Sequence, residues 1–82
     1  MCAVTAPDQP ALGAAVKAIR EEKKISQVAL SEATGFRQSW VSEVEHGRHN
    51  PSFASLVRLA AGLGVRTSTL IRRAERLADE DG

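Results

Sequence analysis

The feature that most constrains the fold is a series of short apolar patterns with helical spacing, each bounded by residues that start or end helices. Leu12, Val16 and Ile19 fall at i, i+4 and i+7, so they share one face of a helix that can begin near Pro10. No stretch of the sequence alternates apolar and polar residues in the way that a half-buried strand requires. The sequence therefore predicts an all-α fold.

Cap residues and glycines predict four further helices. Serine and threonine are good N-caps, and glycine is the residue that most often follows a helix. The expected segments are Ser26 to Thr34 followed by Gly35, Gln38 to Glu45 followed by Gly47, Ser52 to an end at Gly62 and Gly64, and a last helix capped by Thr67. The inward stripes of the last two are Leu56, Leu59, Ala60 and Leu63, and then Leu70, Ala74, Leu77 and Ala78. The prediction is a compact bundle of five helices.

A length of 82 residues suits a single domain. We divide it into a flexible arm at 1–9, a folded domain at 10–78 and an acidic tail at 79–82. The one cysteine, Cys2, cannot form an internal disulfide, and no apolar run reaches the roughly 18 residues of a membrane helix. These features favour a cytoplasmic protein with no membrane partner.

The formal net charge of +1 conceals an uneven distribution of charge along the chain. Residues 10–74 hold ten basic and five acidic side chains, a net charge of +5, whereas residues 75–82 have a net charge of −3. A basic domain is compatible with a nucleic-acid partner, although an ordinary solvated surface would explain this charge equally well.

The segment from Gln27 to Val44 has the pattern of a helix-turn-helix. Two short helices can meet at a steep angle when a small residue lies at their contact, a glycine occupies the turn, and branched apolar residues line the inner face of the second helix. Ser31 is the small residue and Gly35 the turn, while Leu30, Val41 and Val44 face inward. Two short helices around a glycine also occur in proteins that bind nothing, so the pattern alone does not decide the function.

From about Leu12 to Ile71 the chain resembles the phage-repressor or Cro type of helix-turn-helix domain, also called the xenobiotic-response-element type of transcriptional regulator. The resemblance is carried by Leu12-Gly13, Ile19-Arg20-Glu21, Ile25-Ser26-Gln27, Leu30 and Gly35-Phe36, and above all by Ser39-Trp40-Val41-Ser42-Glu43-Val44-Glu45-His46-Gly47-Arg48 followed by Asn50-Pro51-Ser52. It implies a five-helix bundle that binds operator DNA, usually as a homodimer, and regulates transcription, for example as a repressor.

In this family the third helix enters the major groove and its outward face reads the bases. Arg37, Gln38, Ser39 and Glu43 lie on that face if the two valines of the helix point inward. Arginine can pair with guanine and glutamine with adenine, while glutamate can accept a hydrogen bond from cytosine. Arg37 departs from the family, which usually has a capping serine or threonine there, and we interpret the arginine as retained for a DNA contact.

The resemblance also implies residues that hold phosphates and so fix the register without reading the sequence. They are Gln27 at the start of the second helix, Ser42 within the third, and Arg48, His49 and Asn50 just after it. Trp40, beside the reading face, is expected to pack at the edge of the domain or against a sugar–phosphate strand.

Three further structural roles are expected. The family pairs the positions of Arg20 and Glu45, which we interpret as a buried ion pair between the first and third helices. Ser31 replaces the family's usual alanine, and its hydroxyl is expected to bond the carbonyl one turn earlier. Ile71 and Leu77 of the fifth helix are the candidates for a dimer contact.

Other classes of function have less support in the sequence. An enzyme or a metal site is not expected, because the chain has no CxxC or HExxH motif and no serine with an evident general base, and no cofactor is implied. The alternative function is a protein-interaction module of the same fold, such as an antitoxin that binds a toxin, or a regulator that binds the transcription machinery. A stand-alone controller of a neighbouring operon, for instance in a restriction–modification system, is also compatible with the size of the chain.

Overall fold

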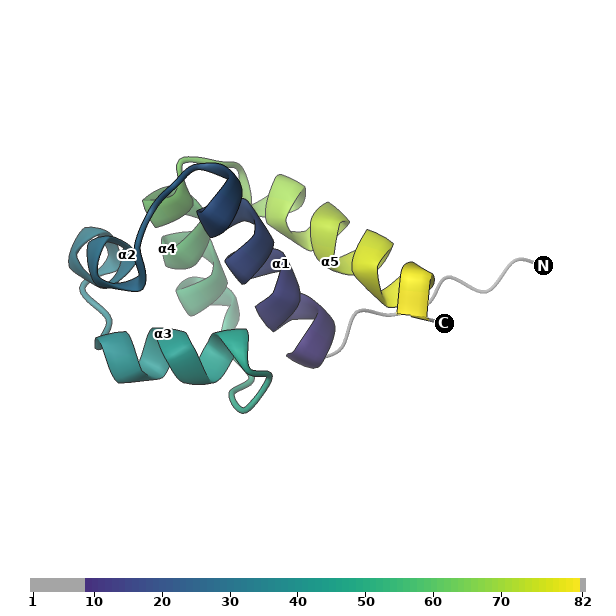
Figure 1. Ribbon diagram of the computed structural model, residues 1–82, viewed down its shortest axis with the longest axis horizontal. Coiled ribbons are helices and arrows are strands. Elements are labelled where there is room, and N and C mark those ends of the chain that lie inside the picture. Colours follow the sequence, from purple (N-terminus) through teal and green to yellow (C-terminus); the bar gives the residue numbers. More distant parts are fainter. Residues whose placement is uncertain (1–8, 82) are drawn as a thin grey trace.

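The structure, a computed structural model, describes residues 9–81 and contains five α-helices (Figure 1). They are α1 (Gln9–Glu22), α2 (Gln27–Thr34), α3 (Gln38–Glu45), α4 (Phe53–Leu63) and α5 (Thr67–Asp81). Within residues 9–81 there is no strand, so the predicted all-α bundle of five helices is confirmed. Residues 1–8 of the expected arm, and Gly82, lie outside the described residues.

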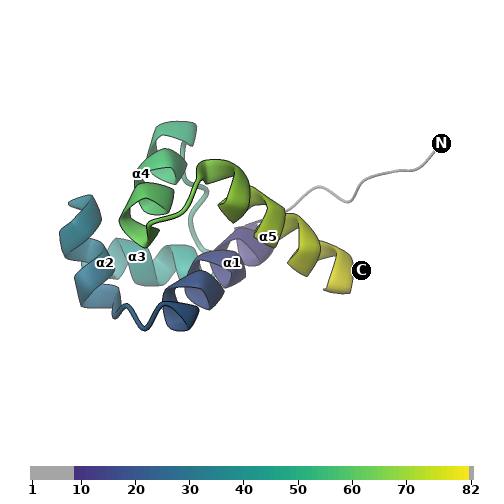
Figure 2. The ribbon, with the colours of Figure 1, turned by 90° about the horizontal axis from the view of Figure 1, so that it is seen from above.

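The helices are arranged around α1. It packs along α5 on one side and against α3 on another, while α2 packs on both α3 and α4 (Figure 1). In the view from above, α1 and α5 extend away from the end formed by α2 and α4, which gives a molecule of 43 × 22 × 22 Å (Figure 2). As a result α3 lies along the lower edge of the molecule in Figure 1, with one side turned away from the other helices.

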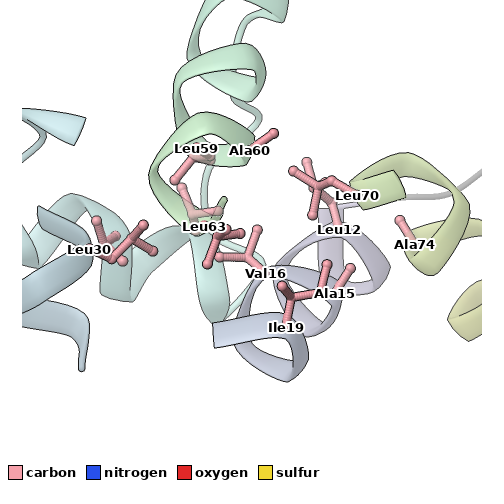
Figure 3. Close-up of a cluster of buried hydrophobic side chains, with 12 residues drawn as sticks. Leu12, Ala15, Val16, Ile19, Leu30, Leu59, Ala60, Leu63, Leu70 and Ala74 are labelled. Carbon is pink, nitrogen blue, oxygen red and sulfur yellow. The ribbon is translucent and has the colours of Figure 1, made fainter. Parts of the chain in front are cut away.

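The core is an apolar cluster to which all five helices contribute (Figure 3). Its buried members are Leu12, Ala15, Val16 and Ile19 of α1, Leu30 of α2, Val41 and Val44 of α3, Leu59, Ala60 and Leu63 of α4, and Leu70 and Ala74 of α5. The inward positions predicted from helical spacing are confirmed for these residues, whereas Leu56, Leu77 and Ala78 are only half-buried. Because both valines of α3 are enclosed, the opposite face of that helix is the one left outward.

A serine cap and a glycine define the ends of α2, as predicted. Ser26 accepts a hydrogen bond at 3.0 Å from the backbone N–H of Ala29, which satisfies one of the first-turn donors. Gly35 follows the helix in the left-handed conformation, with φ of 81°, and so turns the chain toward α3.

The hydroxyl of Ser31 has a different partner from the one expected. It donates to the carbonyl of Phe36, which lies ahead of it in the turn, so the expected bond to a carbonyl one turn earlier is wrong. Thr34 makes that backward bond instead, to the carbonyl of Leu30 at 2.8 Å. Thr34 therefore makes the backward bond at the end of α2, and Ser31 ties α2 to Phe36 in the turn before α3.

The ends of the last two helices differ from those expected. Gly62 does not end α4 but lies inside it where α4 crosses α2, since a Cβ at this position would be 2.6 Å from the Cγ2 of Thr34. The helix is closed by Gly64. Thr67 is the first residue of α5 and not its cap, and α5 continues to Asp81, so residues 79–81 of the expected tail belong to the helix.

Candidate nucleic-acid interface

The outward face of α3 presents polar side chains of several kinds. Gln38 and Ser39 are exposed in the first turn, and Glu43 follows one turn later with 46% of its side chain exposed. The two valines of the same helix, in contrast, are buried in the core. An amide, a hydroxyl and a carboxylate together offer hydrogen-bond donors and acceptors, which are the groups that the edges of base pairs pair with in the major groove.

Arg37 is the N-cap residue of α3, but its side chain makes no capping hydrogen bond. A guanidinium group has donors only, so it cannot accept from the N–H groups of the first turn. The side chain is exposed. The start of α3 therefore combines a cation with backbone donors that lack a side-chain acceptor, an arrangement that suits an anion.

A nearly buried ion pair joins α1 to α3. The guanidinium of Arg20 donates from Nε to Oε2 of Glu45 at 2.7 Å and from Nη2 to Oε1 at 3.1 Å. Only 12% and 2% of the two side chains are exposed, and Arg20 also donates to the carbonyl of Ile25 at 2.9 Å. The hydrogen bond to Glu45 raises the pKa of Arg20 above its ordinary value, so this arginine stays charged. The contact matches the ion pair that the family resemblance implied.

Gln27 also contacts Glu45, the carboxylate of this ion pair. Its side-chain amide donates to Oε1 of Glu45 at 3.0 Å, which brings the first residue of α2 into contact with the last residue of α3. The sequence assigned this side chain to a phosphate. In the structure the amide instead joins α2 to α3, and the first-turn N–H groups of α2 other than that of Ala29, which Ser26 caps, remain for an anion.

A row of stacked side chains, here called the aromatic row, connects α4 to both ends of α3. The guanidinium carbon of Arg58 on α4 lies 4.7 Å from the ring centre of Phe36, and the Phe36 ring lies 4.3 Å from that of Trp40. Trp40 in turn stacks on His49, with ring centres 6.1 Å apart. Arg58 also donates to the carbonyl of Thr34 at 2.9 Å. The row therefore braces the turn before α3 and the connection after it.

Sequence reasoning assigned no role to Arg58 and used Phe36 only as part of the resemblance. Phe36 and Trp40 are four residues apart, but Phe36 lies in the turn before α3, so the helical spacing rule does not predict their contact. The approach of Arg58, which is 22 residues further along the chain from Phe36, has no local signature.

The imidazole ring of His49 contacts Glu43, one of the residues expected to read bases. Its Nε2 lies 3.0 Å from Oε2 of Glu43, and 43% of the histidine side chain is exposed. The other histidine of this region, His46, places Nδ1 2.7 Å from the carbonyl of Ser42. Of the remaining phosphate candidates, Arg48 and Asn50 are exposed in the connection between α3 and α4, and Ser42 is half-buried.

The residues expected at a dimer contact are partly enclosed. Ile71 and Leu77 are half-buried and pack against the core of their own chain. The large apolar side chains that stand out at the surface of the described residues are Val28, Phe53 and Val57, of which Phe53 is 76% exposed. Phe53 and Val57 are four residues apart on α4 and so lie on one side of it.

The described residues hold neither a cluster of metal-ligating side chains nor a helix that could span a membrane. Residues 9–81 contain no group of three or more His, Cys, Asp or Glu side chains that could hold a metal ion. None of the helices in this range is long and apolar enough to cross a membrane.

Comparison with known proteins agrees with this geometry. The family model described as a helix-turn-helix domain matches residues 11–77, which is most of the chain. The immunity repressor protein of Bacillus phage phi105 is 33% identical over 69 residues, covering 84% of this chain, and the chain spans about half (48%) of that repressor's length.

Solved structures show the same fold. The restriction–modification controller protein C.AhdI from Aeromonas hydrophila is 29% identical, with a TM-score of 0.73 over 76% of this chain and 94% of that one. The controller protein C.Esp1396I, described as a tetramer in complex with its natural 35 base-pair operator, is 21% identical, with a TM-score of 0.80 over 85% and 92% of the two chains. At that identity the likeness shows the fold alone. Taken with the match over residues 11–77, these findings establish that the chain belongs to the helix-turn-helix family of the Cro/C1 type, which includes phage immunity repressors and other transcriptional regulators.

Proposed function

We propose that the chain is a sequence-specific regulator of transcription that binds double-stranded DNA with α3 in the major groove. The observation that carries the proposal is the division of α3 into two faces. Val41 and Val44 are enclosed in the core, while Gln38, Ser39 and Glu43 are left outward with donors and acceptors available. A helix fits the width of the major groove, and side chains of these kinds distinguish base pairs there. Arg37, exposed at the start of α3, is assigned to the same reading surface.

Phosphate contacts are assigned to the groups that flank the reading face. Arg48 and Asn50 are exposed after α3, Ser42 lies along it, and the first-turn N–H groups at Gln27 open α2. Helix N-termini and exposed cationic side chains bind phosphates without reading sequence. The basic balance of residues 10–74 supports this assignment.

The operator is proposed to be palindromic and the binding unit a homodimer. Two copies related by a two-fold axis would place their recognition helices roughly 34 Å apart, about one turn of DNA. The apolar side chains available for such a contact are the half-buried Ile71 and Leu77 on α5. Phe53 and Val57 on α4 are exposed and add to this apolar area. Sedimentation at micromolar concentration, with and without DNA, is expected to show a dimer, and a monomer under both conditions would contradict this part of the proposal.

Selection of bound sequences from random duplex DNA tests the function itself. Wild-type protein is expected to enrich one motif with two symmetric halves. Gln38→Ala is expected to relax the preference at one position in each half, with a loss of about 1–3 kcal/mol for the preferred base. An unchanged motif for Gln38→Ala would show that the reading face is wrong, and no enrichment by the wild type would refute sequence-specific binding.

The salt dependence of affinity tests the phosphate contacts. Arg48→Ala is expected to weaken binding to all sequences and to reduce the slope of log K against log salt by about 1. Arg66→Ala is the matched control, because Arg66 is also an exposed arginine but lies in the α4–α5 connection, on the side of the molecule opposite α3 (Figure 1). Equal effects of the two substitutions would mean that Arg48 contributes only to the overall charge.

A further inference from the structure

The contact between His49 and Glu43 gives His49 a different role from the phosphate contact expected of it. Oε2 of Glu43 lies 3.0 Å from Nε2 of His49, within hydrogen-bonding distance. An ionised carboxylate only accepts, so Nε2 is the donor whether the imidazole ring is neutral or protonated. The ring nitrogen that faces α3 is thus engaged with the protein and not with a DNA backbone.

The orientation of the His49 ring is set by the aromatic row. The ring lies nearly parallel to Trp40, at an interplanar angle of 27°, and Trp40 packs on Phe36. Phe36 in turn lies under Arg58, which donates to the carbonyl of Thr34. The side chain of His49, in the connection between α3 and α4, is therefore held by contacts that lead back to α4 and to the end of α2.

We propose that His49 is a positioning residue that acts through Glu43 and thereby sets the selectivity of the protein for one base pair. With Oε2 held by His49, the carboxylate of Glu43 is restricted in orientation, and Oε1 is the oxygen left to accept from a base. A fixed acceptor distinguishes a base edge that offers a donor, such as the N4 amino group of cytosine, from one that does not. Without His49 the carboxylate can turn among several rotamers. The inference rests on the proposed function and adds a specificity determinant to it.

A double-mutant cycle tests the inference, because a residue that acts through another loses its effect when the other is removed. The affinities of wild type, His49→Ala, Glu43→Ala and the double variant are measured for the selected operator and for its single base-pair variants. We expect His49→Ala to reduce the preference at the base pair read by Glu43 about tenfold, with the salt slope unchanged. In the Glu43→Ala background the same substitution is expected to change nothing at that base pair.

Two further variants separate positioning from general damage. His49→Gln retains a side-chain N–H donor and is expected to restore part of the preference. His46→Ala removes the neighbouring histidine, whose ring contacts the carbonyl of Ser42 and not Glu43, and is expected to leave the preference at that base pair unaltered. Thermal unfolding of each variant identifies any that are poorly folded.

The outcomes distinguish this inference from the function on which it rests. If His49→Ala weakens binding to all sequences equally, does so also in the Glu43→Ala background and lowers the salt slope, then His49 is a phosphate contact and the inference is wrong. If Glu43→Ala alters no base preference in a protein that does select a motif, the inference is also wrong while the proposed function stands. A wild-type protein that selects no motif overturns both.

Discussion

The helix α1 is joined to two neighbours by arginine–glutamate pairs that are alike in geometry and different in environment. Arg20 and Glu45 connect α1 to α3, and Glu22 and Arg73 connect α1 to α5. In both pairs the shortest contact is 2.7 Å and the guanidinium makes two hydrogen bonds to the carboxylate. Glu45 has 2% of its side chain exposed, whereas Glu22 has 58%. The distance alone therefore says little about what each pair contributes to stability.

Burial decides the difference between the two pairs. A carboxylate at the surface loses a partner and regains water, so exposed pairs contribute little and are weakened by salt. A buried carboxylate that loses its partner has no such replacement, because the site around it is closed to solvent. The α1–α3 contact, which positions the proposed reading helix, is therefore expected to depend on its ion pair far more than the α1–α5 contact does.

The largest effect is expected at the buried pair. Glu45→Ala leaves the guanidinium of Arg20 without its carboxylate and removes the acceptor of Gln27, so we expect a loss of about 3–5 kcal/mol of unfolding free energy, measured in urea. The combined change Arg20→Met with Glu45→Leu sharpens the comparison. Because it leaves no unpaired charge, it is expected to be more stable than either single change to alanine. A loss no greater than that of Glu22→Ala would contradict the contrast between the two pairs.

A smaller loss is expected at the close approach of α1 to α3. A Cβ added at Gly13 would lie 2.2 Å from the carbonyl oxygen of Val44, so Gly13→Ala must push the two helices apart. We expect a loss of about 1–3 kcal/mol, in contrast to the gain that a glycine-to-alanine change usually gives within a helix. Ala14→Gly, at the exposed neighbouring position, serves as the control for helix propensity. Stabilisation by Gly13→Ala would show that α1 and α3 are less closely packed than described.

The smallest effect is expected at the exposed pair, and it should depend on pH. The hydrogen bonds from Arg73 hold the pKa of Glu22 below its ordinary value of 4.5 in the folded protein. The pair therefore stabilises the fold at pH values above 4.5, and this contribution disappears as the pH falls through the lowered pKa of the folded state. The difference in melting temperature between wild type and Glu22→Gln should be small at neutral pH, smaller in high salt, and absent at strongly acidic pH. A difference that persists in acid would mean that the glutamine disturbs packing.

Local sequence signals predicted much of the fold because they act within a few residues. The bounds of α3 were predicted from two valines and the residues around them, and Ser26 and Gly35 have the cap and turn roles expected of them. The expected stop at Gly62 was wrong because that glycine is required by a crossing with α2, a contact between distant segments.

The sequence predicts where the candidate site lies, but it does not predict which side chains contact one another there. The outward face of α3 follows from the burial of Val41 and Val44, which the helical spacing predicts. The side-chain partners of Gln27 and His49 could not be predicted in this way. Each depends on which of several polar groups lies nearest after the helices have packed, and both turn out to contact a glutamate of α3.

The absence of a side-chain cap at Arg37 affects how fast the first backbone amides of α3 exchange their hydrogens with solvent. α2 and α3 have eight residues each, but only α2 begins with a side chain that accepts from its first turn. Amide hydrogens exchange with solvent through local opening, and a helix end without a side-chain acceptor opens more readily. The first amides of α3 should thus exchange faster than those of α2, so that the helix proposed to meet the bases begins with a backbone less protected than that of its partner in the helix-turn-helix.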